Sequence, residues 1–297
     1  MVKRFLDYVE LRTKSASVLP FLTALAYCFF LQNFINIRAS LLFFAAMLLF
    51  DMTATMINNY IDYRQAGKPG HFSRPVMLIM IFCALLAAAL IGLYLSWLYG
   101  AVFLLAGIFC FFIGITYTFG PMPISRSPYG ELFSGLTMGL VLPFLVVTIN
   151  MPALIYLEFN GWNASVSLDI LGLLKFCLVF APLVFCISNI LVANNIRDFE
   201  ADKAVRYTMV RHIGVKNALR LFEVNYFLCY AAVIVACALG VIPWVCLFVL
   251  VTFIPVFRNI RIFSQKQGDA SAFVIVIQNF FIFIVPYALC IFIGGLV

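Results

Sequence analysis

Two short polar strings with the same pattern stand at the ends of long apolar segments. Residues 58–63 and residues 194–199 both read Asn-Asn-x-x-Asp followed by an aromatic residue, in a chain that is only 10% charged. Carboxylate and amide oxygens are hard ligands that suit Mg²⁺, an ion that completes its coordination shell with water and substrate phosphates. The repetition predicts one polar site built from both strings.

The spacing within each string fits metal ligands on a helix. Asn194, Asp198 and Asp202 recur at four-residue intervals and so share one helical face, with Asn195 close beside Asp198. Two carboxylates about one turn apart repel each other unless a cation lies between them. The predicted metal ligands of the two strings are Asn58, Asn59, Asp62, Asn194, Asn195, Asp198 and Asp202.

Basic residues surround both strings. They are Arg64, Lys68 and Arg74 after the first string, and Arg197, Lys203 and Arg206 in and after the second. Carboxylates that hold a metal, together with basic groups that bind oxyanions, predict a diphosphate site. The alternative is that these polar residues are caps and solvated ends of helices, where Asn and Asp are common.

The elements that position these residues are predicted to be membrane helices. The chain is 65% hydrophobic with a mean hydropathy of +1.09, whereas a soluble domain is about 45–50% apolar. We expect an all-α membrane protein, a single domain over residues 1–297, whose first span is a retained helix rather than a signal peptide. The nine predicted spans cover residues 16–33, 39–60, 75–97, 100–119, 131–150, 170–193, 216–239, 241–257 and 271–295.

The distribution of charge predicts the orientation in the membrane. With a cytoplasmic N-terminus, all of the 19 Lys and Arg residues except Arg38 and Lys175 fall on the cytoplasmic side. Both polar strings lie on that side too, so spans one to four and five to eight are interpreted as two related halves, with span nine added. The net charge of +7 matches an anionic membrane surface and requires no nucleic acid.

The spacing of the cysteines argues against disulfide bonds and thiolate metal sites. The nine cysteines are scattered singly through apolar segments without a C-x-x-C pair, which argues against a disulfide framework and against a thiolate metal centre.

The second string carries a family resemblance. Residues 194–203, followed by Arg206, Thr208 and Arg211, resemble the second aspartate-rich motif of the UbiA superfamily of intramembrane prenyltransferases. The form N-N-x-R-D-x-x-x-D is similar to that of the menaquinone branch of this superfamily. Residues 9–14, and residues 117–121 leading to 130–133, are similar to the same branch. The resemblance spans the whole chain and implies the nine-helix fold of that superfamily.

The first string departs from the family pattern. The usual motif is N-D-x-x-D-x-x-x-D, whereas this chain has Asn59 and Ala66 at the two outer Asp positions and keeps only Asp62. An Asn can still offer a carbonyl oxygen to a metal, but it brings no charge.

The resemblance implies a reaction. A polyprenyl chain is transferred from its diphosphate to an aromatic acceptor, 1,4-dihydroxy-2-naphthoate in the menaquinone branch, with loss of CO₂ to give demethylmenaquinone. Mg²⁺ held by the strings, with Asp62, Asp198 and Asp202 as catalytic carboxylates, assists departure of the diphosphate at a site facing the cytoplasm of the cell membrane. Two alternatives stay open: a related enzyme for 4-hydroxybenzoate, homogentisate, haem or a glycerol phosphate lipid, and a cation-binding transporter.

Three further residues are candidates for the site. Tyr117 can face a carbocation with its ring, although most aromatic residues in such a chain serve packing. Asp51 shares a helical stripe with Asn58 and Asp62 and could orient or deprotonate the acceptor; a structural role, hydrogen-bonded to Ser or Thr, is the alternative. Glu131 could shape the acceptor pocket or cap a helix.

The orientation is testable by cysteine labelling from outside intact cells. We expect an impermeant reagent to reach cysteines introduced near Gly161 and the C-terminus, but not near Lys68 or Lys203, because the basic loops face the cytoplasm. The reverse labelling pattern would overturn both the orientation and the cytoplasmic site.

Overall fold

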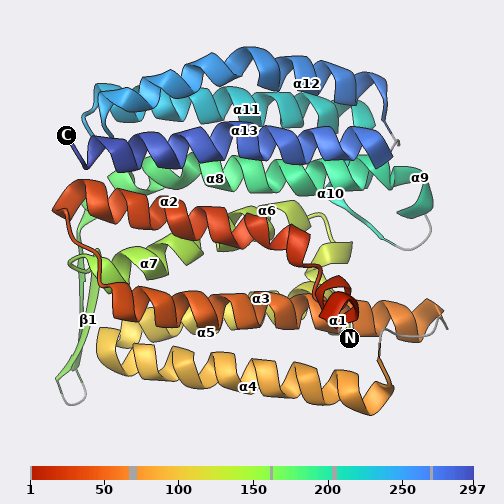
Figure 1. Ribbon diagram of the computed structural model, residues 1–297, viewed down its shortest axis with the longest axis horizontal. Coiled ribbons are helices and arrows are strands. Elements are labelled where there is room, and N and C mark those ends of the chain that lie inside the picture. Colours follow the sequence, from red (N-terminus) through yellow and green to blue (C-terminus); the bar gives the residue numbers. More distant parts are fainter. Residues whose placement is uncertain (1, 67–71, 161–162, 203–205, 268–269) are drawn as a thin grey trace.

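A computed structural model describes residues 2–66, 72–160, 163–202, 206–267 and 270–297 (Figure 1). Within these residues nine helices are long and apolar enough to cross a membrane, which confirms the predicted fold class. The first part of the chain contains α1 (Val2–Tyr8), η1 (Leu11–Lys14), α2 (Ser15–Gln32), α3 (Ile37–Ala66), α4 (Arg74–Tyr99), α5 (Ala101–Thr118) and η2 (Ile124–Arg126).

The second part of the chain begins with a span made of three pieces and a hairpin. These are α6 (Gly130–Leu136), the π-helical segment η3 (Thr137–Val141), α7 (Leu142–Asn150), β1 (Ile155–Asn160) and β2 (Asn163–Leu168). The remaining elements are α8 (Ile170–Arg197), α9 (Phe199–Asp202), α10 (Met209–Ile213), α11 (Val215–Ala238), η4 (Trp244–Thr252), α12 (Phe253–Gln265) and α13 (Ala270–Gly294).

The helices form a bundle whose two ends differ. In Figure 1, α3, α4 and α5 lie on one side, α8, α11, α12 and α13 on the other, and α2, α6 and α7 between them. Helix α8 packs on α11, and α13 packs on α2 and α8. The end of α3, the short α9 and the N-terminus share one end of the bundle, whereas the β1–β2 hairpin and the C-terminus lie at the other. Both polar strings are thus brought to the same end.

The structure differs from the predicted spans in three places. The hairpin, paired antiparallel from Ile155↔Leu168 to Asn160↔Asn163, was not predicted. Span five contains a π-helical turn, and span eight begins at Trp244 and ends at Gln265 rather than covering 241–257. The later start follows from the backbone, because Gly240 takes a left-handed φ of 66° after α11 and Pro243 then precedes η4.

Some spanning helices expose much of their apolar surface, whereas others pack into the core. Helix α4 has the highest hydropathy of the spans, yet only 11% of its window is buried inside the protein. A helix that is apolar all round and exposed is stable only in lipid. By contrast, the π-helical span packs tightly: a Cβ on Gly139 would lie 2.7 Å from the Val184 Cα of α8.

That close approach predicts an unequal effect of adding one methyl group. Gly139→Ala should destabilise the protein by about 1–3 kcal/mol, because the backbone of α8 must move. Gly107→Ala on α5 is the matched control, since nothing lies within 4 Å of its Cβ position. Thermal unfolding in detergent measures both, and equal midpoints for the two variants would contradict the packing.

Candidate active site

A large cavity connects the two polar strings with the apolar interior. Its volume is about 1370 Å³, larger than the roughly 300–1,000 Å³ of common ligand pockets. The polar end is lined by Asn58, Asn194, Asn195, Arg197, Asp198 and Arg206. The walls from α4 and α5 are apolar and include Leu93, Ile108 and Phe112.

The second string forms a compact set of charged hydrogen bonds. Arg197 donates from Nε to Asp198 Oδ1 at 2.7 Å, and from Nη2 to Asp198 Oδ2 at 2.6 Å and to Asn194 Oδ1 at 2.7 Å. Its guanidinium carbon also lies 4.6 Å from the centroid of the Phe273 ring. The oxygens of Asn194 and Asp198 therefore surround a positive group at the edge of the cavity.

The helix carrying the second string is interrupted. Helix α8 ends at Arg197, Asp198 has φ −91° and ψ 7°, and α9 begins at Phe199. The single helical face predicted for Asn194, Asp198 and Asp202 is therefore broken at its middle member. The side chains of Asp62 and Asp202, and Lys68 and Lys203 altogether, lie outside the described residues.

The other members of the second string divide between cavity and core. Asn195 lines the cavity but donates from Nδ2 to Glu131 Oε1 at 2.7 Å, and Glu131 is only 2% exposed. The Glu131 backbone carbonyl accepts from Ser188 Oγ at 2.9 Å. Within the described residues Glu131 Oε2 has no hydrogen-bond partner. Glu131 thus acts as a buried acceptor that orients Asn195.

The first string is also divided. Asn58 lines the cavity, whereas Asn59 donates from Nδ2 to the backbone carbonyl of Tyr8 at 2.9 Å. Arg64 is exposed, and Arg74 donates from Nε to Tyr60 Oη at 3.1 Å. Of the described basic residues predicted around the strings, Arg197 and Arg206 are the ones that line the cavity.

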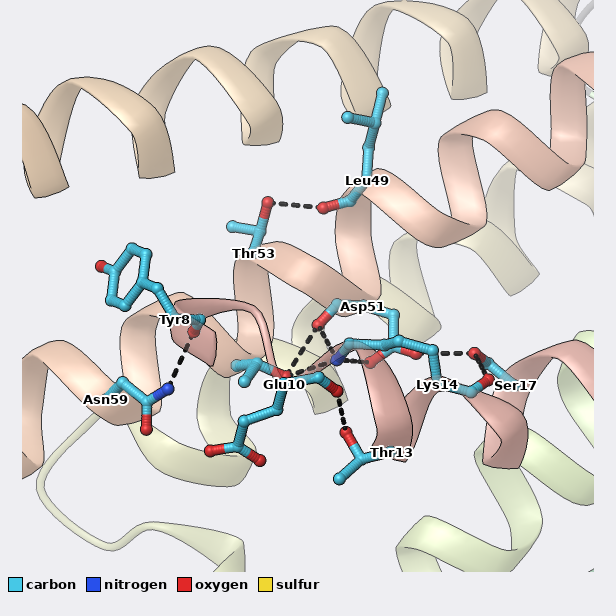
Figure 2. A network of polar contacts seen from close by, with 10 residues as sticks. Tyr8, Glu10, Thr13, Lys14, Ser17, Leu49, Asp51, Thr53 and Asn59 are labelled. Atoms are coloured by element: carbon cyan, nitrogen blue, oxygen red, sulfur yellow. Dashed lines mark hydrogen bonds and ion pairs between the residues drawn. The ribbon is translucent and has the colours of Figure 1, made fainter. Parts of the chain in front are cut away.

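Asp51 and Tyr117 both line the cavity, but Asp51 is already paired. Figure 2 shows the network around it: Asp51 Oδ1 accepts from Lys14 Nζ at 2.8 Å, and Oδ2 from Ser17 Oγ at 2.6 Å. Lys14 Nζ also donates to Thr55 Oγ1 at 2.5 Å and to the Asp51 carbonyl at 3.1 Å. This geometry favours the structural alternative for Asp51.

Lys14 lines the site but was not predicted from the sequence. It is 3% exposed although charged, and it lines the cavity. The available signal was its position beside the first span, in the segment 9–14 that resembles the family. Its partner Asp51 lies 37 positions later, on the next transmembrane helix.

The described donor set fits a hard divalent cation that takes few ligands from protein. Asp198 contributes a carboxylate, and Asn58 and Asn194 contribute amide oxygens, all at the cavity wall. The oxygens of Asp198 and Asn194 already converge on a cation, the Arg197 guanidinium. Among the described side chains no three His, Cys, Asp or Glu residues gather into a cage. Such a set suits Mg²⁺, which usually relies on substrate phosphates and water as well.

Comparisons with known proteins agree with this fold. The sequence matches the UbiA prenyltransferase family over residues 17–285. It is 28% identical over 261 residues to the 1,4-dihydroxy-2-naphthoate octaprenyltransferase of Bacillus subtilis (strain 168), covering 82% of this chain and 76% of that protein. The chain therefore belongs to the UbiA prenyltransferase family and is a multi-pass membrane prenyltransferase.

Solved structures share the fold. A structure of digeranylgeranylglyceryl phosphate synthase superposes with a TM-score of 0.68 at 14% identity, covering 99% of this chain and 98% of the other. A UbiA homolog from Archaeoglobus fulgidus, bound to GPP and Mg²⁺, superposes with a TM-score of 0.64 at 12% identity, covering 99% and 100%. For the residues that the structure describes, the predicted nine-helix architecture is confirmed.

The Glu131–Asn195 contact yields a stability prediction. Glu131→Leu removes the acceptor of a buried amide and should cost about 1–3 kcal/mol. Glu131→Gln keeps a carbonyl oxygen that can accept the same hydrogen bond, so its melting temperature in detergent should stay near that of the wild type. Equal losses in both variants would show that the charge, rather than the acceptor, is what Asn195 requires.

Proposed function

We propose that this enzyme transfers a polyprenyl chain from its diphosphate to 1,4-dihydroxy-2-naphthoate, with loss of CO₂, to form the hydroquinone of demethylmenaquinone. The carrying observation is the cavity, which joins a polar end lined by both Asn-Asn-x-x-Asp strings to long apolar walls. A prenyl diphosphate likewise has a charged head and a long apolar tail. The choice of acceptor is supported by the form of the second string and by the Bacillus subtilis relative.

The charged end of the cavity accounts for the leaving group. Arg197 and Arg206 line it and can bind phosphate oxygens by charge-assisted hydrogen bonds. Asn58, Asn194 and Asp198 would hold Mg²⁺, with Asp62 and Asp202 as further predicted ligands. When bound, Mg²⁺ supplies positive charge that stabilises the departing diphosphate. In exchange for phosphate contacts, Arg197 can release the Asp198 carboxylate.

The covalent steps balance without an oxidant. The allylic C–O bond breaks and its electron pair leaves with the diphosphate. The electron-rich ring carbon of the acceptor then forms a C–C bond to the allylic carbon. That ring carbon loses its carboxylate as CO₂, and the electron pair of the broken bond restores the aromatic ring. Apolar walls exclude water, and the ring of Tyr117 at the cavity wall is the predicted support for the cation.

The acceptor assay decides the reaction. Membranes containing the protein are incubated with Mg²⁺, a radiolabelled polyprenyl diphosphate, and in parallel 1,4-dihydroxy-2-naphthoate, 4-hydroxybenzoate and homogentisate. We expect one dominant product, from the naphthoate, with a mass that shows the loss of CO₂. A dominant product from either other acceptor, or a naphthoate product that retains the carboxylate, would contradict the proposal.

The metal-binding role of the second string predicts the effect of two substitutions. Asp198→Ala and Asp202→Ala should each lower prenyl transfer to below about a tenth of wild type, a loss of at least about 1.4 kcal/mol in the barrier. Mn²⁺ binding, followed by electron paramagnetic resonance, should weaken in parallel. Asp169→Ala is the matched control, because Asp169 caps the other end of α8. Wild-type Mn²⁺ affinity in both site variants would overturn the metal assignment.

A further inference from the structure

The departure from the family pattern at Asn59 coincides with a contact that an amide can make and an ionised carboxylate cannot. Asn59 Nδ2 donates to the backbone carbonyl of Tyr8 at 2.9 Å (Figure 2). An ionised Asp at this position has acceptors only, and it would face the Tyr8 carbonyl oxygen with a negative charge. The replacement of carboxylate by amide therefore joins α3 to the segment that precedes the first span.

That preceding segment is firmly packed. Tyr8 and Val9 are both 0% exposed and form a small core with Met56 and Met77. Tyr8 Oη donates to the Met56 carbonyl at 3.2 Å, and the Tyr8 ring meets Phe72 edge-on at 5.8 Å between centroids. Burial and the neighbouring tyrosines of α3 raise the pKa of Tyr8 to about 12, so its hydroxyl remains a donor at any physiological pH.

A second anchor holds the other end of the same segment. Lys14 and Ser17 bind Asp51, one residue on each carboxylate oxygen. Between the anchors, Glu10 has φ 49° and ψ 56°, a left-handed conformation that costs a non-glycine residue about 1–3 kcal/mol. Contacts on both sides offset this cost.

The clamped segment forms part of the substrate cavity. Glu10, Thr13, Lys14 and Ser17 line it together with Asn58 and Asp51 of α3. Figure 2 shows the Glu10 carboxylate turned away from Asp51. The pKa of Tyr63 in the first string is raised mainly by burial and secondarily by the negative charge of this carboxylate. Residues 8–17 thus run along the first string and close one side of the polar end of the cavity.

We propose that Asn59 is a positioning residue that clamps residues 8–17 against α3, so that this segment forms a fixed wall of the substrate site. In this enzyme position 59 supplies a hydrogen-bond donor to the wall, where the family pattern supplies a charge. Asn58, its neighbour, faces the cavity. The inference rests on the proposed function only in treating the cavity as the substrate site.

The test measures the position of the segment directly. Val9→Cys is introduced, and its labelling by a maleimide in the purified, detergent-solubilised protein is quantified by peptide mass spectrometry. Labelling at position 9 should be slow in the protein that keeps Asn59. It should become about tenfold faster when Asn59→Asp is added, because the hydrogen-bond donor is lost and the new carboxylate repels the Tyr8 carbonyl oxygen. Asn59→Ala should accelerate labelling by a smaller factor. Asn217→Asp is the matched control: Asn217 Nδ2 also donates to a backbone carbonyl, that of Ile213, but at an exposed site on α11.

The same variants separate positioning from metal ligation. If Asn59 positions the segment, Asn59→Asp leaves the Mg²⁺ concentration for half-maximal prenyl transfer unchanged or raises it. A lower Mg²⁺ requirement, with unchanged labelling of the cysteine introduced at position 9, would overturn the proposal and make Asn59 a metal ligand. Hydrogen–deuterium exchange supplies a second readout: residues 8–14 should exchange more slowly in the unaltered protein than in the Asn59→Asp variant, and equal exchange in the two would overturn the clamp. Neither labelling nor exchange depends on which acceptor is used.

Discussion

A buried ion pair between Lys14 and Asp51 supports the first half of the site. Their side chains are only 4% and 15% exposed. Lys14 Nζ also donates to Thr55 Oγ1 and to the Asp51 carbonyl, and the second carboxylate oxygen of Asp51 accepts from Ser17 Oγ. Removing one partner of such a pair typically costs about 3–5 kcal/mol, because the other charge is left buried and uncompensated. This pair fixes the register between the start of α2 and the middle of α3, and with it the place of the first string.

The ion pair in the second string has the opposite character. Arg197 and Asp198 are 26% and 33% exposed, and pairs near water contribute only about 0–1 kcal/mol. Such a pair can be exchanged for contacts to a substrate at little cost. One half of the cavity is therefore held by a pair that must persist, and the other presents a pair that can rearrange. This asymmetry fits the sequences of the two strings, since the second keeps both carboxylates of its motif and the first keeps one.

Hydropathy was sufficient to predict the nine spans found among the described residues, because a helix in lipid needs about 20 apolar residues and pairs its backbone groups internally. It does not report helix geometry, which explains why the π-helical turn at Thr137–Val141 and the late start of span eight were missed. Within the site, local spacing predicted Asn58, Asn194 and Asp198 as metal ligands; all three line the cavity, and their metal binding stays a prediction. The particular partners of Asn59, Asn195 and Asp51 were not predictable, because each is 34 or more positions away along the chain.

The apolar walls of the cavity match the other part of the substrate, its prenyl tail. Leu93, Ile108 and Phe112 line the cavity and are also 57%, 55% and 62% exposed on α4 and α5. Gly92 and Gly107, on the same two helices, have no atom within 4 Å of their Cβ positions. The apolar wall of the cavity therefore carries accessible side chains and open space along both helices. Because these apolar side chains offer a prenyl tail hydrophobic contact only, recognition of the charged diphosphate must come from the polar end of the cavity.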